Sequence, residues 1–381
     1  MGVLSGKSAP GEMGEIVRLF LRLGFTAFGG PAAHLGLMES ETVERRGWLS
    51  RERFLDLVGA CNLLPGPGST QVAMALGYGR AGWMGLVTAG VCFILPASLA
   101  TLALAWAYVR YSNLPQAQGL LYGAKPVMVA VIVQAILKLG RTAFRSWALA
   151  LTGLACFAAA LAGTPPLAVL LASGGLALLA AGLRSRSQTV ASLTWVPLGL
   201  GGVTAGAAGL TSLFLVFLKL GVVVFGSGYV LLAFLKADLV DRLHWITEPQ
   251  LLDAITAGQV TPGPVFATAT FLGYLLRGWA GAAMATAAIF LPSFAMAGLV
   301  GALAGHIRKS KPAAAFLDGV NAASVALMAS VALALGRGAL VDGFAWAVGA
   351  ASGALLVRYR VNATWLILGG AGLGILVRGL A

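Results

Sequence analysis

The sequence is short of charged side chains, and above all of acidic ones. Only 10% of its 381 residues are charged, with 13 acidic residues against 26 basic ones, whereas a soluble globular chain carries roughly 25% charged residues. This is too little polar surface to cover water-soluble domains of this size. The deficit excludes a soluble fold.

Cysteine, histidine and the common catalytic motifs are also scarce. Cys61, Cys92 and Cys156 stand apart in apolar sequence, which offers neither a disulfide framework nor metal-ligand spacing. A Walker phosphate loop, HExxH and GxSxG are all missing. We therefore expect no enzyme, no metal, no cofactor and no ATP drive within this chain.

The net charge of +13 does not indicate nucleic-acid binding. The basic residues are scattered at the ends of apolar segments, which is the pattern that membrane topology requires. We expect no nucleic-acid partner.

Long apolar runs are what the sequence does have: 59% of its residues are hydrophobic and its mean hydropathy is +0.88. Several runs approach the ~20 residues that a helix needs to cross roughly 30 Å of hydrocarbon, and none has the alternation of a β-barrel strand. We predict an all-α integral membrane protein, multi-pass in the cell inner (plasma) membrane, with the lipid bilayer as a partner. The runs cover residues 82–109, 118–137, 147–162, 165–183, 194–218, 282–305, 317–335, 339–357 and 361–377.

The sequence repeats itself internally. Pro65-Gly66-Pro67 matches Pro262-Gly263-Pro264 at an offset of 262 − 65 = 197 residues. After one deletion the offset is 196, at which Gly123 meets Gly319 and Gly140-Arg141 meets Gly336-Arg337. A register held this far with a single gap indicates two homologous multi-helix halves.

The repeat suggests a division of the chain. We place a polar N-terminal tail at 1–14, a first repeat at 15–186, a linker at 187–212 and a second repeat at 213–381. A topology-inverting helix within the linker is one option.

Basic residues predict that the two halves run in opposite directions across the membrane. In the first half they crowd one loop, namely Lys138, Arg141 and Arg145. In the second half they crowd the loop that matches the sparsely charged 110–115, namely Arg308, Lys309 and Lys311. Because basic-rich loops face the cytoplasm, we predict an inverted-topology repeat, an arrangement that places substrate near the membrane midplane.

Paired helix breaks are the best candidate for the substrate site. Each Pro-Gly-Pro segment interrupts an apolar run, so 50–80 and 247–277 are each a broken crossing helix or a re-entrant hairpin. A helix that restarts inside the membrane offers free N–H groups and a positive dipole end, which suit an anion. One copy alone fits an ordinary loop equally well, but two related copies favour a site. Seven side chains are expected to add donors: Ser69, Thr70 and Gln71 in the first half, Thr268 and Thr270 in the second, and Asn62 and Gln259 just before the breaks. Thr261, at the start of the second break, also belongs to the candidate site.

A second pair of glycine clusters follows the first apolar segment of each half. Phe28-Gly29-Gly30 matches Phe225-Gly226-Ser227, and glycine allows close approach of backbone to a ligand or plain helix packing. His34 follows the first cluster, where the second half has Leu231. We include these residues in the candidate site; a packed neutral histidine is the alternative for His34.

Three charged residues stand near these motifs. Lys125 lies inside an apolar run and would attract an anion directly, unless it reaches back to the interface. Asp56 and Asp253 precede the two breaks by about two helical turns and are our candidates for proton coupling. Capping a helix, or pairing with a base such as Arg53, is the alternative role.

Together these motifs resemble the chromate ion transporter (CHR) family in its long two-domain form. Residues 28–34 and 63–71 are similar to that family's N-terminal signatures, and residues 225–229 and 258–264 to its C-terminal ones. The resemblance implies chromate efflux and chromate resistance, with sulfate as a competing or alternative substrate. Asn62 and Ser227 depart from the family pattern, which bears on substrate preference.

The function expected from the sequence is a secondary transporter that exports chromate, driven by the proton gradient or by anion exchange. Sulfate uptake on the same fold and a passive anion channel remain the alternatives, and a homodimer is left open. The inside-negative membrane potential assists anion export by roughly 2.3 kcal/mol per charge per 100 mV.

Overall fold

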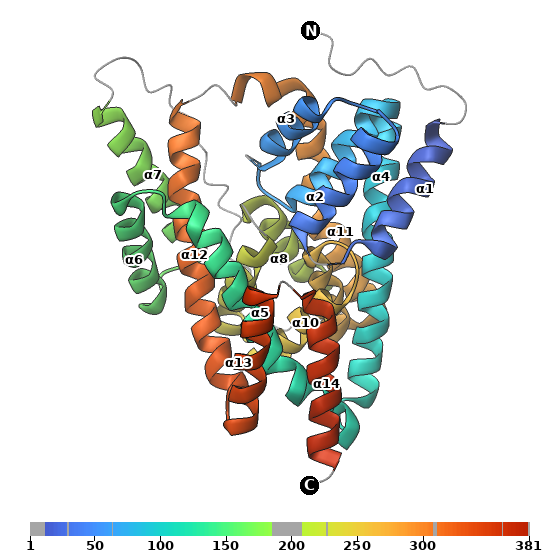
Figure 1. Ribbon diagram of the computed structural model, residues 1–381, viewed down its shortest axis with the longest axis vertical. Coiled ribbons are helices and arrows are strands. Elements are labelled where there is room, and N and C mark those ends of the chain that lie inside the picture. Colours follow the sequence, from blue (N-terminus) through green and yellow to red (C-terminus); the bar gives the residue numbers. More distant parts are fainter. Residues whose placement is uncertain are drawn as a thin grey trace.

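The computed structural model describes residues 12–28, 30–62, 64–184, 208–225, 228–307, 311–359 and 361–379, and within these ranges the chain is helical without a strand (Figure 1). Gly29, Gly226 and Ser227 lie outside the described residues, as does most of the expected linker. The described part of the first half contains α1 (Glu12–Thr26), α2 (Pro31–Glu39), the π-helix η1 (Ser40–Arg45), α3 (Arg51–Asn62), α4 (Gly68–Tyr111), α5 (Pro115–Ala143), α6 (Trp147–Leu161) and α7 (Pro166–Arg184).

The second half follows the same order of elements. Its described elements are α8 (Leu210–Val223), η2 (Gly228–Val230), α9 (Leu231–Leu235), the π-helix η3 (Lys236–Arg242), α10 (Glu248–Val260), η4 (Val265–Ala267), α11 (Thr268–Ile307), α12 (Lys311–Ala339), α13 (Gly343–Arg358) and α14 (Ala363–Gly379). Both halves therefore place a π-helix before the helix that leads into the Pro-Gly-Pro break.

Within the described ranges, four helices are long and apolar enough to cross a membrane: they span Gly68–Tyr111, Pro115–Ala143, Val265–Leu299 and Ala314–Ala339. Trp147 on α6 and Trp365 on α14 are among many large apolar side chains that remain exposed on the outer surface. In a water-soluble protein such a surface marks a partner or an aggregation hazard, whereas it is the surface expected of a protein that faces lipid. The expected all-helical, multi-pass membrane protein is confirmed at this level.

The two longest helices, α4 and α11, each turn back on themselves. Gly82 has φ 58° and ψ −146°, and Gly278 has φ 60° and ψ −147°, values outside the helical region. Gly77 packs against the backbone of Gly85 across the first turn, and Gly273 packs against the backbone of Gly281 across the second. Each long helix is therefore a tight hairpin of a short arm and a long one.

The short arms clarify the interrupted segments. Residues 68–80 of α4 precede the turn at Gly82 and pack beside α3, which has 12 residues. At 1.5 Å per residue neither helix reaches the ~30 Å of a bilayer core. The geometry favours a hairpin of two half-length helices over a single broken crossing.

The end of each half packs on the long helix of the other half. Helices α6 and α7 contact α12, whereas α13 and α14 contact α5. Gly123 of α5 lies against the backbone of Gly370 in α14, and Gly319 of α12 lies against the backbone of Ser173 in α7. Small residues let membrane helices approach this closely, and such packing stabilises helix pairs where lipid removes the hydrophobic drive.

Candidate functional site

The two Pro-Gly-Pro breaks adopt a backbone that favours glycine. Gly66 has φ 113° and Gly263 has φ 95°, and side chains rarely tolerate such positive values. A Cβ at Gly66 would meet Gln71 Nε2 at 2.7 Å and Ser293 Oγ at 3.0 Å, while one at Gly263 would meet Ala97 at 2.7 Å. Each break therefore packs tightly against the other half.

Each break is bonded to the opposite half through its backbone. The Gly66 N–H donates to the Val224 carbonyl at 2.7 Å, and the Gly263 N–H donates to the Ala27 carbonyl at 2.9 Å. Ala27 and Val224 are themselves equivalent in the repeat, since 27 + 197 = 224. The breaks and the chain just after α1 and α8 thus form one reciprocal unit.

His34 ties three parts of this unit together. Its Nε2 lies 3.1 Å from the Ala27 carbonyl, which also accepts from Gly263, and its Nδ1 lies 3.2 Å from Ser69 Oγ. Because a carbonyl only accepts, Nε2 carries the proton and Ser69 donates to Nδ1. The side chain is 1% exposed, so His34 is packed and hydrogen-bonded, which favours the alternative left open by the sequence, a packed neutral histidine.

Polar side chains gather around each break. The Gln71 amide donates from Nε2 to the Pro65 carbonyl at 2.5 Å, and Thr261 bonds Thr101 at 3.1 Å. Among the described residues, three fully buried hydroxyls near the breaks have no hydrogen-bond partner: Thr70, Thr268 and Ser293. Since buried hydroxyls are normally bonded, these three are available to a ligand.

The helix ends after the breaks are equally free. Pro67 and Pro264 occupy the N-cap positions, and neither helix start has a side-chain cap. Uncapped N–H groups and the dipole give such an end a partial positive charge. At the end of α3, Asn62 is exposed, but its Oδ1 lies beside Gly68. Its counterpart Gln259 is buried.

Lys125 and Asp253, which the sequence suggested for different roles, form an ion pair with each other. Lys125 Nζ on α5 lies 3.1 Å from Asp253 Oδ1 on α10, and the Tyr108 hydroxyl of α4 donates to Asp253 Oδ2 at 3.1 Å. The aspartate side chain is 4% exposed and the lysine 22%. Asp56, by contrast, is exposed on α3, so the two carboxylates predicted as a pair have different surroundings.

Each π-helix holds a buried carboxylate between basic residues, which our sequence reasoning missed. Glu41 pairs with Arg22, Arg45 and Arg46, and Asp238 pairs with Lys219 and Arg242. The repeat register contained the signal, because 22, 41 and 45 plus 197 give 219, 238 and 242. Tyr108 had no such signal, since its counterpart is Ala304.

The environment of Glu41 shifts its acidity. Burial acts to raise the pKa of Glu41, but the hydrogen bonds and positive charges of Arg46 and Arg22 together outweigh burial and hold the pKa below its ordinary value of 4.5. Glu41 is therefore a carboxylate at neutral pH and anchors the π-helix to α1.

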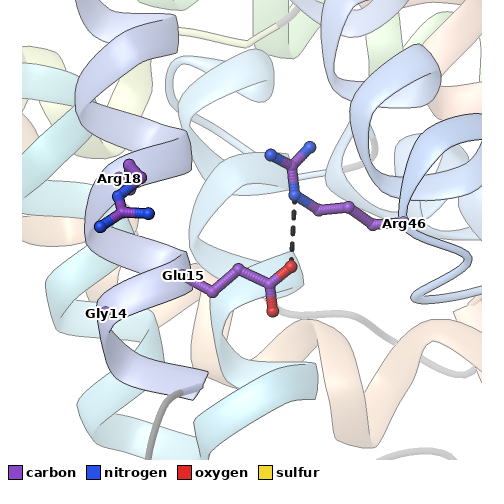
Figure 2. A pocket seen from close by; sticks show the side chains of 4 residues that line it. All are labelled: Gly14, Glu15, Arg18 and Arg46. Atoms are coloured by element: carbon purple, nitrogen blue, oxygen red, sulfur yellow. Dashed lines mark ion pairs between the residues drawn. The ribbon is translucent and has the colours of Figure 1, made fainter.

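A pocket of about 320 Å³ lies at one end of α1, away from the breaks (Figure 2). Gly14, Glu15, Arg18 and Arg46 line it, and Arg46 pairs with Glu15. Elsewhere in the described chain, no group of three His, Cys, Asp or Glu side chains could hold a metal ion. The buried polar cluster at the breaks therefore remains the candidate site.

Comparisons with known proteins identify the family. A family model described as "Chromate transporter" matches the chain twice, over residues 14–179 and 211–375. No solved structure matches the chain.

Three curated relatives are similar over most of their length. A "Chromate transport protein" of Cupriavidus metallidurans is 31% identical over 94% of this chain and 91% of its own. A "Chromate transport protein" of Pseudomonas aeruginosa is 32% identical over 85% of this chain and 81% of its own. A "Probable chromate transport protein" of Synechococcus elongatus is 31% identical, over 86% of each. The chain belongs to the chromate transporter family.

Proposed function

We propose that this protein is a secondary transporter of the plasma membrane that exports chromate, driven by the proton gradient or by anion exchange. Family membership supports a chromate-related anion as substrate. The observation that carries the proposal is the reciprocal pair of helix breaks, with unpartnered buried hydroxyls beside them. A tetrahedral dianion accepts several hydrogen bonds at once, and this cluster offers donors from both halves.

The proposal includes an inverted relation between the two halves. Reciprocal contacts support it, because each break bonds to the other half and each half's last two helices pack on the other half's long helix. Figure 1 also supports it: α7 ends at the top of the view and its counterpart α14 at the bottom. Inverted repeats commonly bind substrate at the interface between the repeats.

Within this site the anion is expected to contact two helix starts and the hydroxyls beside them. The helix starts after the two breaks, that of α4 and that of η4 leading into α11, supply partial positive charge. Thr70, Thr268 and Ser293 supply neutral donors. Lys125 supplies the one full positive charge in our candidate set. A dianion leaving the cell also gains from the membrane potential.

The test is chromate flux into inverted membrane vesicles, with the proton gradient imposed or collapsed. We expect gradient-dependent chromate accumulation by the wild type. The informative variants are Thr70→Val and Ser293→Ala, because each removes a hydroxyl that has no partner in the protein. A hydrogen bond to a charged group contributes about 1.5–3 kcal/mol, so each variant should raise the KM for chromate roughly tenfold or more without loss of folded protein.

Two comparisons make this test specific. Lys138→Ala removes an exposed base from the same helix as Lys125 and should leave the flux near the wild-type value. Sulfate movement in place of chromate, or chromate that merely equilibrates when the gradient is present, would contradict the proposal. Unchanged KM values in both hydroxyl variants would show that chromate does not bind at the breaks.

A further inference from the structure

Helices α3 and α10 occupy the same position in the two halves but have different surroundings. Both pack against α4 and α11, but α10 also packs against α5, α12 and α14. Asp253 and Thr256 of α10 are 4% and 5% exposed, whereas their equivalents Asp56 and Gly59 are exposed on α3. In the described structure, only α10 is therefore enclosed by α4, α5, α11, α12 and α14 together. We call this enclosed position the seat of α10, and the matching position in the other half, which α3 does not fill, the equivalent seat.

The seat of α10 is closed by the Lys125–Asp253 pair. Lys125 comes from the first half and Asp253 from the second, and Tyr108 holds the second carboxylate oxygen. The equivalent seat in the other half would bring Asp56 toward Asn321, since 125 + 196 = 321. Asn321 carries no charge, so the repeat has one ion-pair seat and one neutral seat.

Asp253 therefore presents a buried anion to the one cation that our proposed site offers its substrate. A carboxylate and an oxyanion are alternative partners for a lysine ammonium, because both are acceptors with negative charge. Ionisable residues inside the membrane usually pair with one another or with backbone carbonyls, so a lysine that loses one acceptor gains from another. An arriving anion can be that other acceptor and leave Asp253 free to move with α10.

We propose that Asp253 is a positioning residue that acts as a tethered stand-in for the transported anion. It occupies Lys125 while α10 is seated; the anion displaces it, α10 leaves its seat, and α3 enters the equivalent seat of the other half. This rests on the proposed transport function, and it names the step by which anion binding changes the conformation. Exchange between equivalent positions is how an inverted repeat alternates its access.

Thiol labelling at two equivalent positions tests the exchange in full-length protein reconstituted in vesicles. Gly59→Cys and Thr256→Cys each place one thiol, and a Cβ at Gly59 has no neighbour within 4 Å. Cys61 and Cys92 are replaced by alanine, and the buried Cys156 is kept as a folding reference. With N-ethylmaleimide and no anion, we expect the Gly59→Cys thiol to react at least tenfold faster than the Thr256→Cys thiol.

Neutralising the Asp253 carboxylate should shift the labelling rates of the two thiols in opposite directions, even when no anion is added. In an Asp253→Asn background we expect labelling of Thr256→Cys to rise at least fivefold and labelling of Gly59→Cys to fall, with Cys156 still unreactive. Local unfolding would instead raise labelling at both positions or expose Cys156. Unchanged labelling, or a rise at both positions, would overturn the proposal.

Molybdate, a tetrahedral dianion that does not oxidise thiols, tests the role of the anion. Added to the protein that retains Asp253, it should produce the same reciprocal change, and Lys125→Ala should abolish the response. If Asp253→Asn raises labelling at Thr256→Cys and lowers it at Gly59→Cys, but molybdate causes no such change, the stand-in role is overturned. Chromate flux is measured separately, so a failure of the transport proposal is recognised independently of the labelling result.

Discussion

At the scale of single residues, the candidate site depends on backbone conformations that the sequence signalled only indirectly. The repeated Pro-Gly-Pro segments predicted two breaks, and both lie where expected. Which atoms the breaks contact was not predictable, because Val224, Ala27 and Ser293 reach them from distant parts of the chain. The sequence also named Lys125 and Asp253 separately, since nothing local to either residue shows that they form a pair.

Gly66 provides a direct test of the break geometry. Gly66→Ala should destabilise the protein by roughly 1–3 kcal/mol, because φ 113° is a strained conformation for alanine, and its Cβ would also crowd Gln71 and Ser293. The measurement is the apparent Tm in detergent. Gly59→Ala is the matched control, since its Cβ meets nothing within 4 Å and alanine favours a helix. Equal Tm values for the two variants would contradict the described backbone.

Glu41 predicts how stability depends on pH. Because its folded pKa lies below the ordinary 4.5, the unfolded chain takes up the proton first as the pH falls. The stabilisation is complete above about pH 4.5 and is lost as the pH falls through the folded pKa. Glu41→Gln should therefore flatten the fall in Tm below pH 4.5, while Glu44→Gln, at an exposed position nearby, should leave the wild-type curve intact. A steep acid transition in Glu41→Gln would refute this.

At the scale of helices, composition predicted the class and the repeat predicted the pairing of elements. Apolar runs of about 20 residues can only be helices in a membrane, and the runs beginning near 118 and 317 correspond to α5 and α12. The hairpins inside α4 and α11 were not predicted. Gly82 and Gly278 matched in register, but a glycine in an apolar run equally fits a straight helix with a packing contact.

The close contact of α5 with α14 should be sensitive to one added methyl group. A Cβ at Gly123 would clash with the Gly370 carbonyl, so Gly123→Ala should cost about 1–3 kcal/mol through overpacking. Gly319→Ala should behave alike against Ser173. Gly175→Ala on α7 has no neighbour within 4 Å and should keep the wild-type Tm. If all three variants melt together, the helices do not approach as described.

At the scale of the whole molecule, the basic residues predict how the two halves are oriented in the membrane. Arg145 and Val341 are equivalent, since 145 + 196 = 341, and both are exposed in the loops before α6 and α13. The following N-caps, Ser146 and Asp342, match as well. Charge counts predict that these loops lie on opposite sides of the membrane, but they cannot show how the two halves are packed together.

Side-specific labelling tests this orientation. With the three native cysteines replaced, Arg145→Cys and Val341→Cys are treated with a membrane-impermeant maleimide in intact cells and in inverted vesicles. We expect each thiol to react in only one preparation, and the two to react in different ones. Labelling of both thiols from the same side would establish parallel halves and remove the inverted repeat from the proposal.

The crossed hydrogen bonds between the breaks and the opposite half also have a consequence for biosynthesis. When the first half leaves the ribosome, the Gly66 N–H has no Val224 carbonyl to meet, and α5 has no α14 beside it. The first half must therefore remain in the bilayer without these contacts until the second half is inserted. A gene split between the halves should yield a working protein only when both fragments are made in the same cell.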